Sequence, residues 1–329
     1  MTDDPEVTVV IPSRNRWQRL GGSLASALRQ EDVALEVVLV DDGSRERAPA
    51  RLVGLDDPRV RLVRHATSRG VARARNAGIE RARGEWVAFL DDDDLWSPRK
   101  LRSQLDAAAA TGAGWVYART VVIDEAGEQS EGASELPDPR ELAKRILAWN
   151  VIPAGSSNVM VRTALLRDVG GFDEALAHLA DWDLWIRLAA ASPAAACPEV
   201  LVGYVAHSQN MHAGDLSEVL RELEYLEDKH RDARSLQGVE LDGVRFSRWL
   251  AWGHRRAGRR LAASRVYLAG AIEHRDAGNL RRAARALLGT RPLRKRRPQA
   301  GAPGWLELHL WSAEAHQGGL PQGSTWPRR

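Results

Sequence analysis

The chain has 329 residues, of which 44% are hydrophobic and 28% charged, as in an ordinary globular protein and unlike a disordered or fibrous chain. Its single cysteine, Cys197, excludes an intramolecular disulfide. The sequence contains no run of about 18 uncharged apolar residues, so no membrane span is predicted. The formal net charge is only +3, but sixteen Lys or Arg face two acids over residues 245–297, so the preceding part of the chain is net acidic.

Short apolar segments alternate with amphipathic segments of helical length in the first third of the chain. Strands are predicted at residues 7–11, 36–40, 60–64 and 86–90. Helices are predicted at 17–29, 45–55, 71–83 and 98–110, the last with Ser97 as its N-cap and Pro98 as its first residue. Continuous apolar strands between helices indicate an α/β fold with a mostly parallel central sheet flanked by helices.

The rest of the chain is predicted to extend this fold and then to become helical. Further strands are predicted at 115–124, 156–161 and 198–206, and further helices at 139–148, 181–191, 245–257, 261–273 and 280–288. We therefore expect an α/β domain over residues 1–212 and a basic helical extension over 213–289. Residues 290–329 are rich in Pro, Gly and Arg, and we expect this tail to be flexible.

Adjacent carboxylates follow two of the predicted strands. Asp41 and Asp42 follow the second strand, and Asp91–Asp94 follow the fourth. Because ligands of open α/β sheets bind beyond the carboxyl ends of the strands, both clusters are expected to face one crevice. Asp-Asp-Gly-Ser is also a typical turn, and acids also favour a helix N-terminus, but two clusters at one sheet edge favour a cation site. Carboxylate oxygens without adjacent His or Cys suit Mg²⁺ or Mn²⁺ shared with substrate phosphates.

Five motifs occur in order along the chain. They are VVIPSRNR at residues 9–16, VDDGS at 40–44, GVARARNAG at 70–78, GEWVAFLDDDD at 84–94 and DWDLWIRL at 181–188. In this order they resemble the motifs of a family 2 glycosyltransferase, an enzyme with the GT-A fold. The resemblance extends over roughly residues 7–210. Each motif is weak by itself, but five in register indicate the family strongly.

The resemblance implies how a nucleotide-sugar donor is bound. Asp42 corresponds to the acid that hydrogen-bonds the nucleotide base, typically uracil, with Asp41 beside it. Pro12, Ser13 and Arg14 correspond to the loop that lines this base. The expected donor is therefore a UDP- or dTDP-linked sugar.

The resemblance also implies roles for the acidic row and for one histidine. Asp91 or Asp92 would contact the ribose or the donor sugar, and Asp93 corresponds to the metal ligand of the DxD motif. His207 follows the last predicted strand, where a histidine in several relatives completes the metal or diphosphate shell; a histidine in a surface loop is the alternative. The expected cofactor is Mn²⁺ or Mg²⁺.

Asp181 corresponds to the general base that deprotonates the acceptor hydroxyl. It begins a predicted helix in which Leu184 and Leu188 bury one face, so its carboxylate is held in place. The alternative is an acid that only caps the helix. The family often has Glu before this residue, whereas this chain has Ala180, so that acceptor contact is not carried over. Asp183 is expected on the surface.

The predicted helix between the third and fourth strands carries several arginines. One of Arg69 or Arg73 is expected to reach the nucleotide diphosphate; the alternative is a basic helix face in solvent. Asn76 and Gly78 are expected to be structural, as a polar anchor and a close-packing site. We do not expect Cys197 to act as a nucleophile, because a buried small apolar side chain is its usual role without a partner histidine.

Together these assignments predict a metal-dependent, inverting glycosyltransferase that transfers a sugar to an acceptor hydroxyl in glycan, cell-envelope or secondary-metabolite biosynthesis. One alternative is a sugar-1-phosphate nucleotidyltransferase, which is disfavoured because the loop after the first strand lacks the glycines of a phosphate-binding loop. The other is a non-catalytic module that binds a nucleotide sugar or a glycan, which the acid at position 181 disfavours.

The basic C-terminal helices suggest partners for the protein. Contact with an anionic membrane surface is favoured over a merely solvated surface, at about 1 kcal/mol per basic residue. Nucleic acid is not an expected partner, because no recognised module or set of interleaved aromatic residues is present. The acidic, polar start MTDDPEV does not resemble a signal peptide. We therefore expect a cytoplasmic protein, peripheral at the inner face of the membrane; lipid-linked glycan, secondary metabolite and protein remain alternative acceptors.

Overall fold

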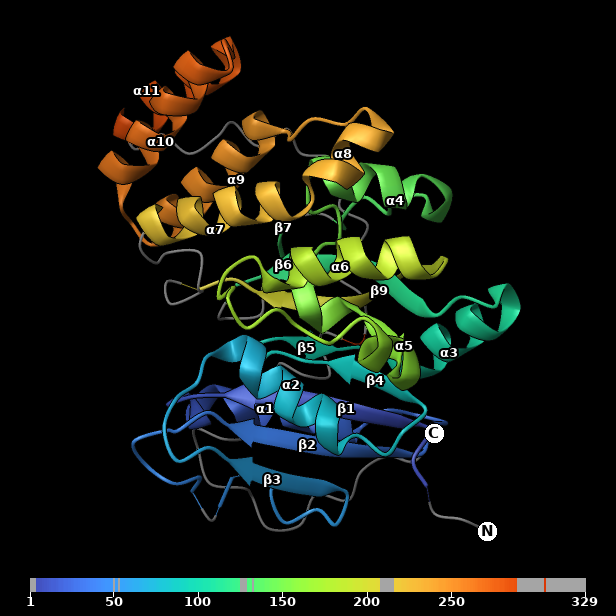
Figure 1. Ribbon diagram of the computed structural model, residues 1–329. Helices are drawn as coiled ribbons and strands as arrows, with labels where there is room; N and C mark the ends of the chain where they lie inside the picture. The colour runs from blue at the N-terminus through green and yellow to red at the C-terminus, as the bar shows by residue number, and fades with distance from the viewer. Residues whose placement is uncertain are drawn as a thin grey trace.

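The computed structural model describes residues 4–49, 51–52, 54–124, 129–131, 133–207, 216–288 and 305. The predicted boundary between residues 212 and 213 lies outside the described residues, as does the predicted tail over 290–329 apart from Trp305. In Figure 1 the first strands form the lower layers of the molecule, the later strands lie above them, and the C-terminal helices lie at the top.

One mixed sheet has the strand order β3-β2-β1-β4-β8-β6-β9-β5, with β7 paired to β6. The first half is parallel and contains β1 (Val7–Ser13), β2 (Leu35–Asp41), β3 (Val60–Arg64) and β4 (Trp86–Phe89). The second half contains β5 (Leu95–Trp96), β6 (Trp115–Ile123), β7 (Gln129–Glu131), β8 (Met160–Arg162) and β9 (Ala194–Val205). There β6 and β9 are parallel, and the other described pairs are antiparallel. The predicted α/β fold is confirmed.

Helices cover both faces of this sheet (Figure 1). They are α1 (Trp17–Leu28), α2 (Val71–Arg81), α3 (Lys100–Thr111), α4 (Pro139–Ala148), α5 (Thr163–Asp168) and α6 (Ala180–Ala191). The alternation of side chains along β1 divides the core: Val9 and Ile11 pack with Leu20 of α1, whereas Val10 packs with Ile79 of α2. Every residue of β1 and β2 is buried, as expected for strands covered on both faces.

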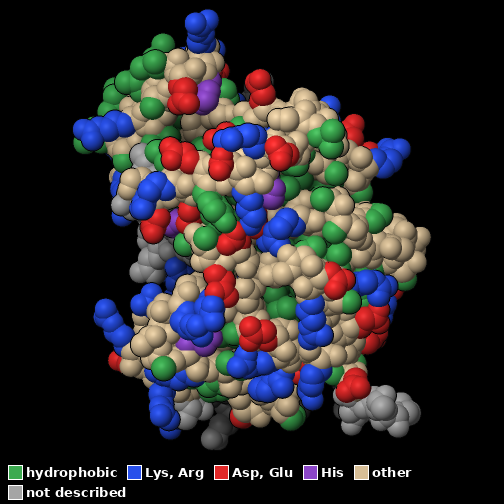
Figure 2. All heavy atoms as spheres, viewed as in Figure 1, with side chains coloured by type: hydrophobic (Ala, Val, Ile, Leu, Met, Phe, Trp, Pro, Cys, Tyr) green, Lys and Arg blue, Asp and Glu red, His purple; other side chains and the backbone are tan. Residues whose placement is uncertain are grey.

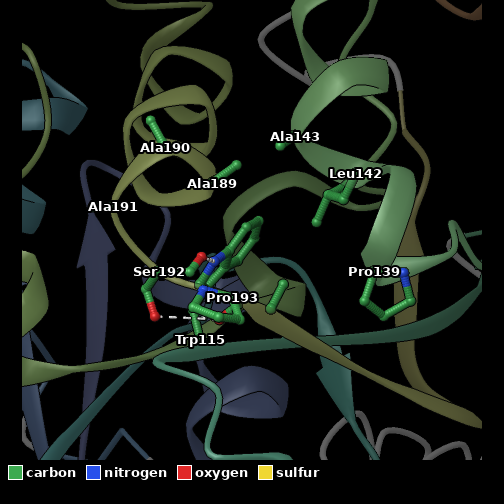
Figure 3. Close-up of a pocket in the computed structure, with 10 residues that line it drawn as sticks. Trp115, Pro139, Leu142, Ala143, Ala189, Ala190, Ala191, Ser192 and Pro193 are labelled. Atoms are coloured by element: carbon green, nitrogen blue, oxygen red, sulfur yellow. Dashed lines mark hydrogen bonds between the residues drawn. The ribbon is translucent and has the colours of Figure 1, made fainter.

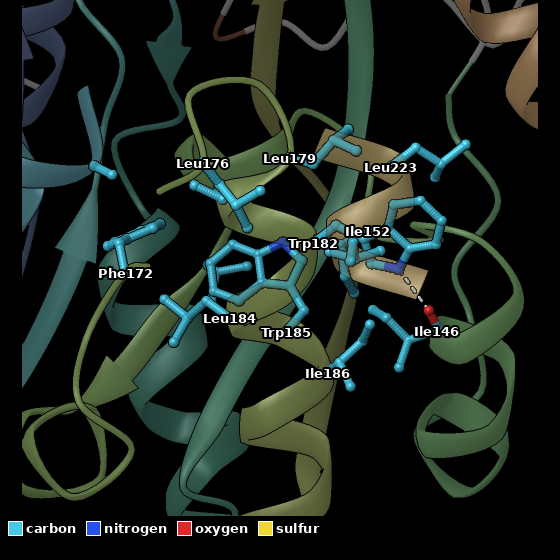
Figure 4. Close-up of a cluster of buried hydrophobic side chains, with 14 of the residues drawn as sticks. Ile146, Ile152, Phe172, Leu176, Leu179, Trp182, Leu184, Trp185, Ile186 and Leu223 are labelled. Atoms are coloured by element: carbon cyan, nitrogen blue, oxygen red, sulfur yellow. Dashed lines mark hydrogen bonds between the residues drawn. The ribbon is translucent and has the colours of Figure 1, made fainter. Parts of the chain in front are cut away.

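The C-terminal part is helical, as predicted, with α7 (Leu216–Lys229), α8 (Arg231–Gln237), α9 (Gly243–Arg256), α10 (Arg260–Glu273) and α11 (Ala277–Leu288). These helices share a core with the α/β part. Trp182 of α6 is 1% exposed, its Nε1 donates to the backbone oxygen of Ile146 at 2.6 Å, and Leu223 of α7 joins the same cluster (Figure 4). Across the described ranges, no helix is both long and apolar enough to cross a bilayer.

The predicted helix over residues 45–55 is wrong. Its described residues form bends and turns, and Pro49 within it lacks the N–H that a helix interior requires. The helix predicted from Pro98 begins at Lys100 instead, with Arg99 at the N-cap. Ser97 lies two residues before this N-cap, and its N–H donates to the backbone oxygen of Leu201 in β9, so it continues the edge of the sheet.

The strand predicted over residues 156–161 is partly wrong, because it begins only at Met160. The segment before it, Gly155–Asn158, is a 3₁₀ turn. The side chain of Asn158 explains this turn: its Oδ1 accepts from Ala118 N at 2.7 Å, and its Nδ2 donates to Ala118 O at 2.9 Å. A buried amide thus takes the place of backbone pairing beside β6.

Gly78 lies where α2 packs closely against β1, since a Cβ added there would lie 2.3 Å from Val10 Cγ1. Gly78→Ala is expected to lower the free energy of unfolding by about 1–3 kcal/mol, because the core would be overpacked. The matched control is Gly21→Ala in α1, where no atom lies within 4 Å of the added Cβ and a gain of about 0.5–1 kcal/mol is expected. Urea denaturation measures both, and equal changes would show that Gly78 is not a packing constraint.

Candidate active site

A cavity of about 1030 Å³ opens beyond the carboxyl ends of β1, β2 and β4 and continues beneath α9. Its wall includes the β1 loop over residues 12–16, Asp42, three acids of the acidic row (Asp91–Asp93) and Asp181. A smaller cavity of about 320 Å³ lies between α4 and the end of α6 and is lined by Trp115, Leu142 and small residues, with no charged side chain (Figure 3). The cavity of about 1030 Å³ is the candidate active site, because it lies beyond the carboxyl ends of the strands and brings acids from several elements together.

Asp42 lies in the cavity wall and is held by four hydrogen bonds. Its Oδ1 accepts from His65 Nδ1 at 2.8 Å and from Arg69 N at 2.9 Å, and its Oδ2 accepts from Ser68 Oγ at 2.7 Å and from Gly70 N at 3.0 Å. Burial opposes the charge, but the hydrogen bonds outweigh burial and lower the pKa of Asp42 below its usual value. Asp42 is therefore an ionised acceptor at neutral pH.

Asp41 does not line the cavity. Its carboxylate is buried, pairs with Arg64 Nη1 at 2.8 Å and accepts from Ser44 N at 2.9 Å. This acid therefore fixes the loop after β2, while its neighbour Asp42 faces the cavity.

The loop after β1 carries Pro12, Ser13 and Arg14, and all three line the cavity. Asn15, at a φ of 57°, ties this loop to the loop after β2, because its Oδ1 accepts from Arg45 N at 2.8 Å. The predicted base-binding residues and Asp42 therefore lie on two joined loops at one edge of the sheet.

Arg16 neutralises the middle of the acidic row, and sequence reasoning missed it. Its Nη1 lies 3.3 Å from Asp92 Oδ1 and 2.9 Å from Asp93 Oδ2. Asp92 also accepts from Ser13 Oγ at 2.7 Å, and Asp93 Oδ2 lies 2.8 Å from Nε2 of the buried His207. The signal in the sequence was a second arginine in the same loop as Arg14.

Two of the four acids resist ionisation. Burial, and then the charge of Asp93, raises the pKa of Asp92 to about 7. Burial also raises the pKa of Asp94 well above its usual value, although Asp94 Oδ1 accepts from Val205 N at 3.0 Å. Asp91 pairs with Arg75 Nη2 at 2.5 Å. The row is therefore tolerated because four cationic or polar side chains, those of Ser13, Arg16, Arg75 and His207, face it and because it carries fewer than four charges.

Arg69 and Arg73 do not place their side chains in the cavity wall. Arg73 pairs with Glu174, and Arg69 contributes its backbone N–H to Asp42. Arg75, on the opposite side of α2 from Arg73, lines the cavity instead. Asn76 and Gly78 are structural as predicted: Asn76 bonds to the backbone of residue 172 through both side-chain ends.

Asp181 lies at the second residue of α6, in the cavity wall. Its Oδ1 accepts from Trp182 N at 2.7 Å, its Oδ2 lies 3.4 Å from Asn150 Nδ2, and a Cβ at Gly155 would be 2.8 Å from Oδ2. Burial raises the pKa of Asp181 to about 6, and Arg75 opposes this shift. A carboxylate with this pKa is ionised at neutral pH yet basic enough to accept a proton.

Asp183 is not on the surface, so that prediction is wrong. It is 0% exposed; its Oδ2 accepts from Arg187 Nη2 at 2.6 Å, and its Oδ1 lies 2.8 Å from both Lys229 Nζ and His230 Nε2. Burial opposes ionisation, but His230, Arg187 and Lys229 outweigh it and hold the pKa of Asp183 well below its usual range. Residues two apart point to different sides of a helix, and here α7 and α8 cover the second side.

The strand order and flanking helices are those of the GT-A fold. Among solved structures, Staphylococcus aureus TarS 1–349 in complex with UDP has a TM-score of 0.51 at 18% sequence identity, covering 88% of this chain and 93% of that chain. This likeness concerns the fold.

The family follows from sequence. A family model described as "Glycosyl transferase family 2" matches residues 8–170. The succinoglycan biosynthesis protein ExoO of Rhizobium meliloti (strain 1021) is 35% identical over 256 residues, covering 73% of this chain and 70% of that protein. The UDP-Glc:alpha-D-GlcNAc-diphosphoundecaprenol beta-1,3-glucosyltransferase WfgD of Escherichia coli is 26% identical over 186 residues, covering 56% of this chain and 70% of that protein. The chain belongs to the family 2 glycosyltransferases, with relatives in polysaccharide biosynthesis.

The two acids of α6 are expected to differ in their effect on stability. Asp183→Asn should lower the free energy of unfolding by about 3–5 kcal/mol at neutral pH, because it removes the buried carboxylate that Arg187, Lys229 and His230 share. The matched control Asp181→Asn should be neutral or stabilising above its pKa of about 6, because it removes a buried charge.

The contributions of Asp183 and Asp181 to the free energy of unfolding are expected to change with pH in opposite directions. With a lowered pKa, Asp183 stabilises the protein at neutral pH, and this contribution is lost as pH falls below about 4. With a raised pKa, Asp181 contributes the opposite: its burial costs stability as pH rises through about 6. Urea denaturation of both variants across pH measures this, and equal losses at neutral pH would contradict the assignment.

Proposed function

We propose that this glycosyltransferase is metal-dependent and inverting, and that it moves a sugar from a UDP- or dTDP-linked donor to an acceptor hydroxyl. The observation that carries the proposal is the shared cavity: the ionised Asp42, the acidic row and the basic carboxylate of Asp181 line one space. WfgD is a UDP-Glc-dependent glucosyltransferase and TarS has been crystallised with UDP, which supports a uridine nucleotide as the first donor to test.

The nucleotide would bind at the Asp42 end of the cavity. A carboxylate has about four lone-pair sites, and four donors already use those of Asp42. A base N–H therefore needs one donor to leave, and Ser68 Oγ is the side-chain donor that also lines the cavity. The neighbouring Pro12–Arg14 loop supplies the surface against which the base would lie.

The residues around Asp93 fit a divalent ion. Within the described ranges, no group of three His, Cys, Asp or Glu is arranged to hold a metal by itself. Asp93 and His207 nevertheless meet at 2.8 Å, and Mg²⁺ is typically held by one or two protein ligands together with substrate phosphates. Asp93 and His207 would hold Mn²⁺ or Mg²⁺, which as a Lewis acid favours departure of the diphosphate. Arg16, beside Asp93, adds a second positive charge for the same leaving group.

Asp181 would act as the general base. As the acceptor oxygen forms its bond to the anomeric carbon, the bond from that carbon to the diphosphate oxygen breaks, and the acceptor proton passes to Asp181. One displacement inverts the configuration, so no covalent intermediate with the enzyme is required. The fixed position of Asp181, between Asn150 and Gly155 at a helix start, supports this role.

A membrane-bound acceptor is supported by the surface of α10 and α11. Three apolar side chains are largely exposed there: Leu261 (66%), Ile272 (73%) and Leu288 (76%). Exposed arginines lie on the same two helices, including Arg281 and Arg282, and Figure 2 shows hydrophobic and basic side chains together over this region. Apolar insertion and attraction to anionic headgroups act together at such a surface. We therefore propose peripheral contact with an anionic membrane and a lipid-linked glycan as acceptor.

Two substitutions distinguish the proposed role of Asp93 in donor binding from the proposed role of Asp181 in transfer to the acceptor. Asp93→Ala is expected to abolish the Mn²⁺-dependent part of UDP binding, because it removes a metal ligand. Asp181→Asn is expected to bind UDP as the wild type does but to transfer sugar about 10²–10⁴ times more slowly, because only the proton acceptor is lost. Calorimetric titration with UDP and measurement of nucleotide release test the pair. Normal transfer by Asp181→Asn would remove Asp181 from the role of base.

The wild-type pH profile is an internal control for this assignment. Because burial raises the pKa of Asp181 to about 6, the kcat/KM for transfer should fall about tenfold per pH unit below that value. The affinity of the protein for UDP should not fall in the same pH range. A profile that stays flat down to about pH 4 would contradict a base with a raised pKa.

Membrane contact is tested with vesicles. The triple variant Leu261→Ser, Ile272→Ser, Leu288→Ser is expected to lose most of its sedimentation with vesicles of phosphatidylcholine and phosphatidylglycerol, because it removes the inserting side chains. The matched control is Leu62→Ser, an exposed leucine of β3. Wild-type binding should weaken in salt and without phosphatidylglycerol. Equal sedimentation of the triple variant and the wild type would argue against membrane contact at α10 and α11.

A further inference from the structure

One face of α9 forms the far end of the active-site cavity. Arg245, Arg248, Trp249 and Trp252 all line this cavity, and their spacing of i, i+3, i+4 and i+7 places them on one side of the helix. An amphipathic helix usually packs its aromatic stripe into a core. Here the stripe also lines the cavity, although Trp249 packs against the core as well, and it alternates with cationic side chains.

The aromatic side chains at this end hold one another in fixed orientations. Trp149, at the end of α4, lies edge-on to Trp182 at 5.8 Å, to Phe246 at 6.4 Å and to Trp249 at 6.1 Å between ring centroids. Trp149, Trp249 and Trp252 are only half-buried, so parts of their surfaces border the cavity. In the described part of the chain, no acceptor receives the Nε1–H of Trp149. Trp182 follows Asp181 directly, so this aromatic cluster begins beside the proposed base.

Three arginines line the same end of the cavity, and two of them are paired with acids. Arg145 of α4, one turn before Trp149, lines it and forms no ion pair with a described residue. Arg245 is exposed and meets only the capping Asp242 at 3.2 Å, whereas Arg248 is anchored to Asp276 at 2.8 Å. Glu135 also lines the cavity. Of the three arginines, Arg145 is thus the one without an ion pair to a described residue, and a guanidinium fork suits a diphosphate or carboxylate group.

We infer that this end of the cavity is the acceptor subsite and that it binds a sugar carrying an anionic group. The negative face of an indole ring attracts the C–H face of a pyranose, and an indole N–H can donate to a sugar hydroxyl. Trp249 and Trp252 would hold the acceptor sugar, and Arg145 its anionic group, with the attacking hydroxyl directed toward Asp181. This inference rests on the proposed function, because it takes the donor to lie at the Asp42 end.

A purely structural role for the same cluster would predict different results. If the tryptophans only attached α9 to the α/β part, their loss would lower stability and impair donor and acceptor binding together. If they form a subsite, acceptor binding should weaken while UDP binding stays unchanged. Leucine replacements keep apolar volume in the cluster, so they test recognition with the least loss of packing.

The experiment measures binding to the full chain, in the presence of UDP, by calorimetry. The probes are N-acetylglucosaminyl diphosphate on a short alkyl chain, octyl glucuronide, neutral octyl N-acetylglucosaminide and an alkyl diphosphate without sugar. Trp249→Leu and Trp252→Leu should each weaken the three sugar probes by about tenfold and leave the Kd of UDP unchanged. The control is Trp305→Leu, whose indole donates to Val200 O at 3.0 Å outside the cavity wall.

A second pair of variants tests the charge. Arg145→Gln should weaken the anionic sugar probes by about tenfold and leave the neutral probe unchanged, whereas Arg255→Gln, an exposed arginine of α9 outside the cavity wall, should change neither. Whether the diphosphate or the glucuronide binds more tightly identifies which anionic group the subsite prefers.

Two results would overturn the subsite: tryptophan variants that bind the sugar probes like the wild type, or a wild type that binds UDP but none of the sugar probes. If Trp249→Leu lowers the melting temperature of the protein, the binding of the sugar probes by Trp252→Leu decides whether the subsite exists. Failure of the wild type to bind UDP would instead count against the proposed function itself.

Discussion

The acidic row after β4 places the strongest constraint on this site. Two unit charges about 4 Å apart repel by about 4 kcal/mol in a protein-like medium, so four carboxylates in sequence at the end of a buried strand need partners. Those partners come from three separate elements: Arg16 from the loop after β1, Arg75 from α2 and His207 from the segment after β9. The repulsion is thus relieved only when the strand ends and α2 are assembled.

The row is also relieved by incomplete ionisation. Burial raises the pKa of Asp92 to about 7 and the pKa of Asp94 well above its usual value. Arg16 lies between Asp92 and Asp93, at the place where a positive charge is most needed.

The sequence predicts the acids of the site better than their partners. Asp42, Asp93 and Asp181 follow strand ends or begin a helix, and such positions can be located from the periodicity of apolar residues. Arg16 and the burial of Asp183 depend on contacts between residues far apart in the chain, which periodicity does not report. The error at residues 45–55 has a local cause: the amphipathic pattern favours a helix, but Pro49 lacks the N–H that a helix interior requires. The aromatic end of the cavity requires α9 to fold back over α4, which no local pattern specifies.

The C-terminal helices are part of the active site's support. Glu222 of α7 accepts from the backbone N–H groups of residues 177, 178 and 179, at 2.8 to 2.9 Å, and so fixes the segment that leads into α6. Lys229 and His230 hold Asp183 on the far side of the same helix. The start of α6, and with it Asp181, is therefore fixed from the side opposite the cavity. A base that must lie within about 3 Å of an acceptor oxygen benefits from such fixation.

Arg75 connects the acidic row with Asp181 electrostatically. Its guanidinium lies over the ring of Phe172, 5.2 Å from the centroid, and pairs with Asp91 at 2.5 Å. The same charge lowers the pKa of Asp181, while the charge of Asp91 raises it. Under the proposed function, a donor bound at the acidic row would change the surroundings of Asp91 and therefore the field at Asp181. The proton affinity of Asp181 would then be coupled to donor binding through one arginine, whose position an aromatic ring fixes.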